Sequence, residues 1–256
     1  MRILAVQISE VNARLNYFDS DSDTLLNQWD LTFNDKLEYR YKEFLNDYFL
    51  SEGIFKLEVD ECLVSWEGSR STLVPSSLFV ESNASEIFKT SFGANFIKAN
   101  IDFNRLAKLN IVNVFDRPLW LKSFFVLKYP SVIIQHQGSY LLKYLSQVTK
   151  KNEEILSVLS IQQDHFLLII FHNEELKAYL TNKYDHKDDI IYHYANAFNQ
   201  LNILKSNGVL KIISSSKKAH DIANNIEEDI NNLKLTPQLE IVSDSLFILK
   251  AFQTCV

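Results

Sequence analysis

Residues that could bind a metal ion gather in the second half of this 256-residue sequence. Imidazole and carboxylate groups are ligands of zinc and iron, and a run of such residues occurs there: His165, His172, Glu174, Glu175, His186 and His193. Their spacing forms neither an HExxH motif nor a facial triad. Because several of them lie at predicted strand ends that face different ways, we interpret them as scattered surface residues and expect no metal site.

A catalytic triad is a second possibility, formed by Ser139, His136 and Asp116. In such a set the histidine accepts the hydroxyl proton and makes the serine nucleophilic. The sequence around Ser139 contains no nucleophile elbow. Strand ends in α/β folds often carry function, but a histidine in this position more often makes structural hydrogen bonds, and we expect the structural role for His136.

An anion site is a third possibility, in the segment from Ser214 to Lys218 that precedes a predicted helix. Serine hydroxyls, backbone N–H groups and two lysines at a helix N-terminus could together hold a negative charge. We favour the simpler interpretation, a serine N-cap followed by solvated lysines.

Hydrophobic periodicity predicts the same series of elements in both halves of the chain. The first half has a hairpin over residues 3–18, a strand over 24–33, a helix that ends before Gly53 and a strand over 54–66. The second half has strands over 154–162, 165–172 and 175–184, a helix over 188–204, a strand over 209–214, a helix over 217–233 and a strand over 238–243. This repetition indicates a duplicated unit, because solenoid repeats are much shorter.

Two local patterns in the first half predict which side chains are buried. The apolar face of the helix is expected to consist of Leu37, Tyr41, Phe44, Leu45 and Tyr48, which share one side at 3.6 residues per turn. Phe55, Leu57 and Val59 alternate with polar residues, as expected for a strand that already begins at residue 54.

Residues from about 73 to 116 have no counterpart in the second half. They predict a short helix at Pro75 and strands over 95–103 and 110–116, after which Asp116 is placed to cap a helix. A strand over 131–137 and a helix over 138–148 follow. We therefore expect a first lobe of residues 1–154 with an inserted subdomain at about 73–116, and a second lobe of residues 155–256, joined compactly.

Composition narrows the classes of partner and compartment. The formal net charge of −6 and the pI near 5.6 disfavour nucleic acid, whose phosphates require a basic surface. Only two cysteines occur, Cys62 and Cys255, which fits a reducing compartment. No segment approaches the roughly 18 consecutive apolar residues of a membrane helix, and the first residues resemble a strand more than a leader peptide. We expect a cytoplasmic protein without a membrane span.

Glycine is scarce, with only five residues in the chain: Gly53, Gly68, Gly93, Gly138 and Gly208. P-loop and Rossmann motifs need several glycines within a few residues so that the backbone can approach phosphate. No two glycines here are close enough, and both motifs are excluded.

The duplicated unit with an insertion in its first copy resembles the actin-like ATPase fold of actin, the sugar kinases and the bacterial cell-division and pilus-assembly actin relatives. The segments "STLVPSSLF" (71–79) and "NVFDRPLWLKSFFVLKYPSVIIQH" (113–136) resemble recurring segments of an uncharacterised bacterial family, a domain of unknown function assigned to that fold. The resemblance implies an α/β fold of duplicated ribonuclease H-like type, in which two lobes have mixed sheets flanked by helices.

In catalytic members of this superfamily, the resemblance implies that ATP lies between the lobes, with an aspartate at the end of each first strand and glycines in each first turn. In this chain Gln7 and Ser9 occupy those positions in the first lobe, and Ser160 and Gln162 occupy them in the second. A third turn, which would support the adenosine with two glycines, falls on three serines: Ser214, Ser215 and Ser216.

These departures predict a degenerate phosphate site, since amides and hydroxyls lack the charge that holds a divalent ion and side chains at glycine positions obstruct the backbone. We expect a non-catalytic binding or scaffolding protein, with no catalytic residues, no cofactor and an unknown protein partner at the insertion. The alternatives are an ATPase that uses Glu10 and Asp164 as displaced ligands for magnesium and ATP, or a nucleotide-binding protein without turnover. The candidate cleft residues are Gln7, Ser9, Glu10, Gln162, Asp164, Ser214 and Ser215.

Overall fold

A computed structural model describes residues 1–33, 38–149, 155–203, 208–214, 217–232, 238–241 and 250–252. The described chain divides into two compact units, one of Met1–Tyr140 together with Phe252 and one of Leu141–Ala251. The lobe boundary that we predict at residue 154 lies outside the described residues, and each unit is described separately below.

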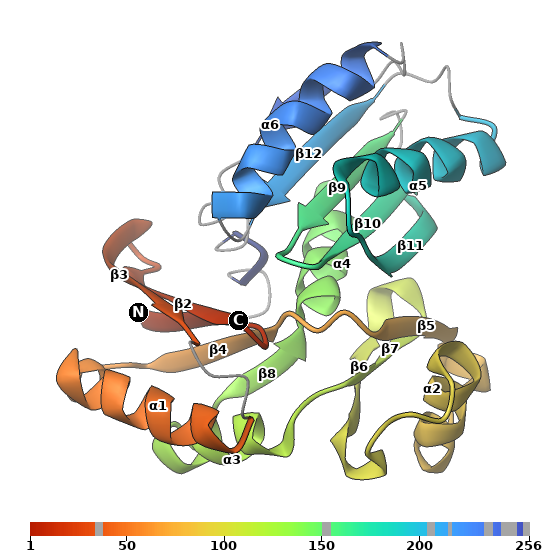
Figure 1. Cartoon of the computed structure of the whole chain (residues 1–256). Coiled ribbons are helices and arrows are strands. Elements are labelled where there is room, and N and C mark those ends of the chain that lie inside the picture. Colours follow the sequence, from red (N-terminus) through yellow and green to blue (C-terminus); the bar gives the residue numbers. More distant parts are fainter. Residues whose placement is uncertain are drawn as a thin grey trace. The chain divides into compact units, whose positions relative to one another are not determined.

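The first unit contains a five-stranded mixed sheet in the order β3-β2-β1-β4-β8 (Figure 1). Its strands are β1 (Arg2–Ile8), β2 (Asn12–Asp19), β3 (Thr24–Thr32), β4 (Glu61–Trp66) and β8 (Ile133–His136). The first three pair antiparallel as a meander, and β4 pairs parallel with both β1 and β8. The central strand β1 is apolar at almost every position and buried on both faces, which explains its nearly continuous hydrophobic run.

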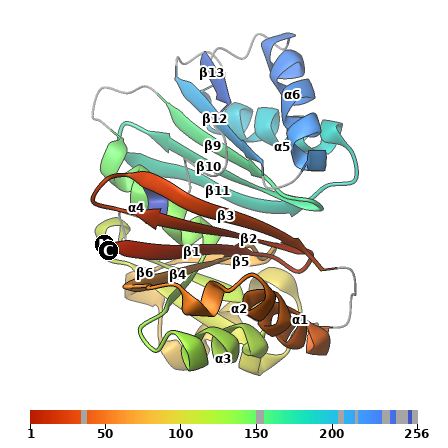
Figure 2. The ribbon, with the colours of Figure 1, turned by 90° about the vertical axis from the view of Figure 1, so that its left-hand side faces the viewer.

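Helices α1 (Glu38–Ser51) and α3 (Leu119–Lys128) pack on the same face of this sheet (Figure 2). Tyr41, Leu45 and Phe49 of α1 are buried at four-residue spacing, and the Phe49 ring meets that of Phe124 edge-on at 5.4 Å. The prediction for Phe44 is wrong, because its side chain is 41% exposed. The buried stripe follows every fourth residue, and this places Phe44 at the rim of the helix face.

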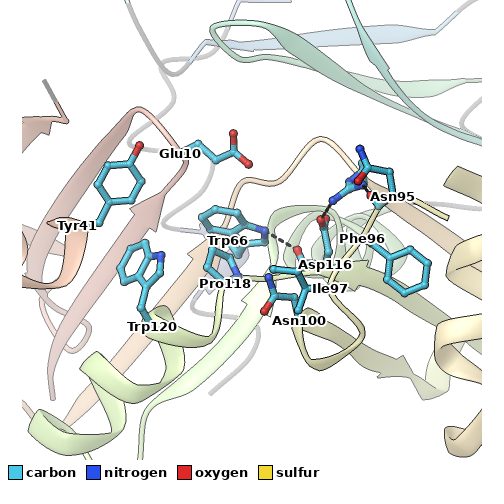
Figure 3. Close-up of a pocket in the computed structure, with 11 residues that line it drawn as sticks. Glu10, Tyr41, Trp66, Asn95, Phe96, Ile97, Asn100, Asp116, Pro118 and Trp120 are labelled. Atoms are coloured by element: carbon cyan, nitrogen blue, oxygen red, sulfur yellow. Dashed lines mark hydrogen bonds and ion pairs between the residues drawn. The ribbon is translucent and has the colours of Figure 1, made fainter. Parts of the chain in front are cut away.

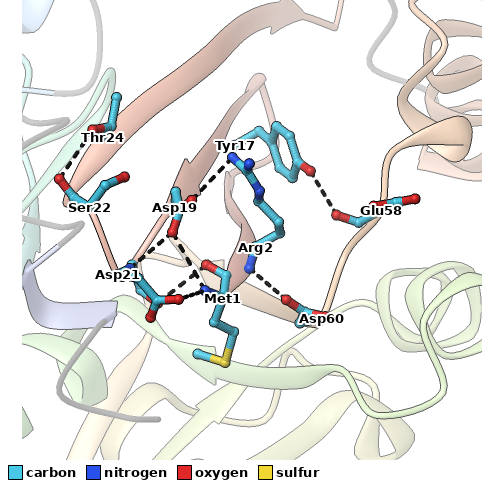
Figure 4. A network of polar contacts seen from close by, with 10 residues as sticks. Met1, Arg2, Tyr17, Asp19, Asp21, Ser22, Thr24, Glu58 and Asp60 are labelled. Atoms are coloured by element: carbon cyan, nitrogen blue, oxygen red, sulfur yellow. Dashed lines mark hydrogen bonds and ion pairs between the residues drawn. The ribbon is translucent and has the colours of Figure 1, made fainter.

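The predicted start of the fourth strand is also wrong. Residues 54–56 form a short 3-10 helix after Gly53, whose φ of 68° stops α1, and strand β4 begins only at Glu61. Side chains near the start of the sheet hold the intervening segment (Figure 4). Tyr17 donates its hydroxyl hydrogen to the carbonyl of Glu58 at 2.7 Å, and the carboxylate of Asp60 accepts from the backbone N–H of Arg2 at 2.7 Å. The alternation of apolar residues at 55–59 therefore reflects packing of a loop on the core.

The inserted segment forms a small antiparallel sheet of its own, in the order β5-β7-β6. Its strands are β5 (Ser71–Pro75), β6 (Ile101–Leu106) and β7 (Ile111–Asp116), and helix α2 (Ala84–Phe92) packs on them. Phe79, Phe88 and Val114 form part of its separate core. The predicted strand over 110–116 matches β7, whereas the one predicted over 95–103 overlaps β6 only from Ile101, because residues 98–100 form a 3-10 helix. The structure adds β5. A proline at its end is compatible with its position at the edge of the sheet.

The second unit repeats the first sheet in order and direction. Its order is β11-β10-β9-β12-β13, formed by β9 (Leu156–Ile161), β10 (His165–His172), β11 (Glu175–Lys183), β12 (Val209–Ser214) and β13 (Gln238–Ile241), with helices α5 (Lys187–Gln200) and α6 (Lys217–Asn232). Again the first three strands form an antiparallel meander, and β12 pairs parallel with β9 and β13. Both sheets confirm the predicted duplicated α/β fold. Helix α4 (Gln137–Val148) joins the two units in sequence.

Candidate functional site

The turn between β1 and β2 is closed by the side chain of Ser9. Its hydroxyl oxygen accepts hydrogen bonds from the backbone N–H groups of Val11 and Asn12, both at 3.1 Å, and donates to the side-chain oxygen of Asn12 at 2.6 Å. The N–H of Ser9 itself donates to the carbonyl of Asn12 at 2.9 Å. A phosphate oxygen would need the same turn N–H groups, and in this turn the serine hydroxyl already engages them.

Gln7 lies one residue before the end of β1, in register with Ser65 on β4. Its side chain is only 3% exposed, and its amide nitrogen and oxygen have no hydrogen-bond partner among the described residues. A neutral amide in this position does not replace the charge of a carboxylate ligand to magnesium.

The corresponding turn of the second unit joins β9 to β10 and is held differently. The buried side chain of Gln162 donates from Nε2 to the hydroxyl of Ser160 at 3.2 Å, and Tyr184 donates its hydroxyl hydrogen to the carbonyl of Gln162 at 2.6 Å. The carboxylate of Asp164 lies 2.8 Å from Nδ1 of His165, within hydrogen-bond distance. The hydrogen bond from His165 lowers the pKa of the Asp164 carboxyl below its usual range.

The residues of the β1–β2 and β9–β10 turns do not fit a magnesium ion with the phosphates of ATP. Neither first strand ends in a carboxylate, and side chains occupy the turns. The hydroxyl oxygen of Ser214 lies 3.4 Å from Nδ1 of His220. Ser215 and Ser216 lie outside the described residues. Within the part of the chain that the structure describes, no three His, Cys, Asp or Glu side chains come together in a way that could hold a metal ion.

His136, Ser139 and Asp116 do not form a catalytic set. Nδ1 of His136 accepts from the backbone N–H of Gly138 at 3.0 Å, so the ring hydrogen is on Nε2, which faces the carbonyl of Gly68 at 3.0 Å. The hydroxyl of Ser139 accepts from the side chain of Asn113 at 3.0 Å. His136 is 1% exposed, and these contacts describe a structural histidine.

The prediction that Asp116 caps α3 is wrong, because no side chain caps that helix and its N-cap is Pro118. The carboxylate of Asp116 forms an ion pair with Arg70 instead. The nearby guanidinium is the stronger partner for a carboxylate, since a charged pair outweighs one bond to a backbone N–H.

A pocket of about 490 Å³ lies at the carboxyl ends of β1 and β4 in the first unit, between the main sheet and the loop that leads into β6 (Figure 3). This end of parallel strands is where open α/β sheets bind their ligands. The pocket is lined by aromatic rings, amides and charged groups: Glu10, Tyr41, Trp66, Arg70, Asn95, Phe96, Ile97, Asn100, Asp116, Pro118 and Trp120.

Long-range contacts hold the walls of this pocket in place. The indole N–H of Trp66 donates to the backbone carbonyl of Asp116 at 2.8 Å. Arg70 donates to the carbonyl of Asn95 at 2.9 Å and lies 5.2 Å above the ring of Phe88. Burial raises the pKa of the Asp116 carboxyl above its usual range, and the charge of Arg70 only partly offsets this. The carboxylate is therefore held in a partly desolvated setting.

Of the predicted cleft residues that the structure describes, only Glu10 lines the pocket; Asp116, which was considered for a catalytic triad, lines it as well. Gln7, Ser9, Gln162, Asp164 and Ser214 do not line it, and their proposed role stays a prediction. The segment 113–136 contributes Asp116, Pro118 and Trp120, so its resemblance to a recurring family segment was the signal that could have located this site.

The sequence also matches a family model over residues 2–233, that of the protein of unknown function DUF3822. The chain belongs to the DUF3822 family. A search of curated proteins finds no match to it. No helix among the described residues of this DUF3822 protein is long and apolar enough to cross a membrane.

Solved structures similar to this DUF3822 protein confirm the actin-like fold. A Bacteroides thetaiotaomicron protein with actin-like ATPase fold and unknown function is 17% identical, with a TM-score of 0.80 over 100% of this chain and 96% of its own. PilM, in the PilM–PilN type IV pilus biogenesis complex, is 11% identical, with a TM-score of 0.57 over 94% and 88%. The cytoplasmic domain of EpsL from the type II secretion system of Vibrio cholerae is 11% identical, with a TM-score of 0.53 over 100% and 94%. At these identities the likeness concerns the fold alone.

Proposed function

We propose that this DUF3822 protein is a non-catalytic member of the actin-like fold class that binds another protein, and that the inserted segment, at about residues 73–116, carries the binding surface. The observation that carries the proposal is the first turn, in which the Ser9 hydroxyl engages the N–H groups of Val11 and Asn12. A nucleotide would have to displace this hydroxyl and would find no carboxylate at Gln7 to organise a magnesium ion.

The geometry of the insertion supports the proposal that it carries the binding surface. It has its own sheet and its own core, and it exposes apolar side chains: Leu78 is 71% exposed and Ile97 is 62% exposed. Ile97 also lines the pocket. Exposed apolar side chains beside a pocket are features of protein interaction sites. PilM, which shares the fold, is found in a complex with PilN, and this supports a binding role for the scaffold.

Calorimetric titration with ATP and ADP, with and without Mg²⁺, tests the proposal that the protein is non-catalytic. We expect no saturable heat and no thermal shift at millimolar nucleotide. Magnesium-dependent binding that is lost in both Glu10→Ala and Asp164→Ala would instead support an ATPase with displaced ligands. Glu43→Ala, an exposed α1 variant, is the matched control for a change of net charge.

Affinity purification with surface variants tests the proposal that the insertion binds another protein. Substitutions are preferred to a deletion, because removal of the insertion would expose Trp66. We expect a partner captured by the wild type to be lost from the Leu78→Ser and Ile97→Ser variants. Leu127→Ser, at a position that is 73% exposed on α3, should retain it. An unchanged set of partners for all three variants would contradict the proposed surface.

A further inference from the structure

We propose that the surface formed by Leu78, Val80 and Arg105 binds an acidic side chain of the partner, a glutamate or aspartate with apolar neighbours. This inference rests on the proposed function, because it gives the chemistry of the partner segment that the insertion would bind. Arg105 belongs to β6, and Leu78 and Val80 come directly before and after Phe79. The guanidinium of Arg105 lies 5.1 Å from the centre of the Phe79 ring, so these side chains belong to one part of the insertion surface.

Arg105 has no carboxylate partner within the part of the chain that the structure describes. Other arginines form ion pairs with aspartates: Arg2 with Asp19, Arg14 with Asp30, Arg70 with Asp116, and Arg117 with Asp102. The exposed guanidinium of Arg105 therefore has N–H groups to offer to an acceptor on another molecule. A carboxylate is the acceptor whose two oxygens match the fork of a guanidinium.

Two phenylalanine rings hold the Arg105 guanidinium in place. It lies 5.1 Å from the ring centre of Phe79 and 5.4 Å from that of Phe103, and the two ring centres are 4.9 Å apart. Phe79 is buried and belongs to the same core as Phe88. A guanidinium that already rests on packed rings loses little conformational freedom when it binds a carboxylate, and this preorganisation favours affinity.

The apolar side chains that flank Phe79 supply the rest of the surface. Leu78 is 71% exposed and Val80 is 56% exposed. A partner segment that covers both would keep water away from the ion pair, and opposite charges attract more strongly in such a setting than in open solvent. Arginine and aromatic side chains are enriched in the cores of protein interfaces. We therefore expect the partner segment to have apolar residues on both sides of its carboxylate.

The charges of the insertion also favour an acidic partner, although the whole chain has a net charge of −6. Asp102 and Asp116 pair with Arg117 and Arg70, which lie just outside the insertion. The other charged side chains of the insertion are two glutamates and four cations: Glu81, Glu86, Lys89, Lys98, Arg105 and Lys108. The insertion thus has an excess of positive charge at its surface, which attracts an acidic segment and repels a basic one.

Nuclear magnetic resonance of the arginine side chains measures this binding directly. The chain contains six arginines, so the Nε–H region of a nitrogen-15 spectrum is simple, and the signal that disappears in Arg105→Lys is that of Arg105. The main probe is an acetylated, amidated pentapeptide with a glutamate between two leucines and a glycine at each end. A second peptide has glutamine in place of the glutamate, a third has serines in place of the leucines, and sodium acetate supplies a free carboxylate.

We expect the glutamate peptide to shift the Arg105 signal saturably and the glutamine peptide to bind about fivefold more weakly, the upper range for an ion pair at a surface. The serine peptide and acetate should also bind more weakly, because they leave Leu78 and Val80 uncovered. Arg105→Gln, observed through the backbone N–H signals of residues 78–80, should weaken the glutamate peptide about fivefold. Lys122→Gln, which removes an exposed cation on α3, should leave binding unchanged.

Equal binding of the glutamate and glutamine peptides would overturn the inference, and so would equal effects of Arg105→Gln and Lys122→Gln. No saturation by the glutamate peptide up to about 10 mM would overturn it as well, as would an equal affinity for acetate. A partner that is lost from Leu78→Ser and Ile97→Ser but kept by Arg105→Gln would support the proposed function and contradict this inference, so the two failures are distinguishable.

Discussion

Ser9 and Asn12 form a reciprocal pair across the first turn: the N–H of Asn12 donates to the Ser9 hydroxyl at 3.1 Å, and that hydroxyl donates to the Asn12 side chain at 2.6 Å. The pair stabilises the turn, because the serine side chain engages N–H groups that would otherwise be available to an anion. The turn is therefore complete without a ligand.

Replacing Ser9 should destabilise the first unit. Ser9→Ala leaves the N–H groups of Val11 and Asn12 without their acceptor, and the expected loss in the free energy of unfolding is about 1–3 kcal/mol. Urea denaturation followed by circular dichroism measures it. Ser22→Ala, in the exposed turn before β3, is the control and should change stability by less than about 0.5 kcal/mol. Equal effects of the two substitutions would contradict this role for Ser9.

The ion pair between Arg70 and Asp116 should make one mutant's stability depend on pH. Burial already raises the folded pKa of Asp116 above its ordinary value, and Arg70→Gln removes the charge that opposes this rise. A carboxyl with a raised folded pKa adds stability below its unfolded pKa and loses that stability as the pH rises through the folded pKa. Arg70→Gln should therefore cost about 1 kcal/mol more at pH 7 than near pH 4, a difference reduced for solvent screening because Arg70 is 36% exposed.

The double variant Arg70→Gln/Asp116→Asn controls for this titration. Asparagine does not ionise, so the difference between the double variant and Asp116→Asn should stay constant from pH 4 to 7. Urea denaturation at several pH values gives each difference. A loss in Arg70→Gln that is the same at acidic and neutral pH would show that packing, and not the charge of Asp116, is responsible.

His136 should be a neutral ring with its hydrogen on Nε2. Nδ1 accepts from the N–H of Gly138 at 3.0 Å, and this bond requires an unprotonated Nδ1. Nitrogen-15 NMR of the histidine side chains distinguishes the two ring nitrogens at neutral pH. Protonation of Nδ1 would contradict the assignment and would return His136 to the candidates for acid–base chemistry.

Cys62 should be unreactive in the folded protein. Its thiol is 2% exposed in β4, and burial raises its pKa above the usual range, so the reactive thiolate is depleted. A Cys255→Ser variant isolates this thiol, because the sequence contains only two cysteines. We expect labelling by a thiol reagent at pH 8 to be slow in buffer and fast in urea. Rapid labelling without denaturant would mean that β4 opens readily.

Much of the fold could be predicted because it depends on local patterns. The meander, the helix after it and their repetition follow from period-two and 3.6-residue spacing of apolar residues, and the apolar run at residues 3–6 of β1 marks the centre of the first sheet. Phe44 and the segment at 55–59 failed as predictions for a shared reason. Their apolar spacing fitted an element, but the position of the packing partners decided which side chains were buried.

The candidate site could be predicted only in part. Glu10 was found because a turn after a central strand is a recognisable place, whereas Arg70, Asn95 and Trp120 come from separate elements with no shared pattern. No local spacing reveals that the last residue of β7, Asp116, pairs with Arg70 just before β5, since that contact spans 46 positions of sequence.

The amino-acid sequence by itself determined the order of the elements, their duplication and the residue types at the strand ends, because these depend on neighbours along the chain. Only the tertiary structure decided that the Asp116 carboxylate pairs with Arg70 and that a pocket opens beside Glu10. Hydrogen-bond geometry, desolvation and ion pairing act over a few ångströms in space. They are settled once distant segments have been packed together.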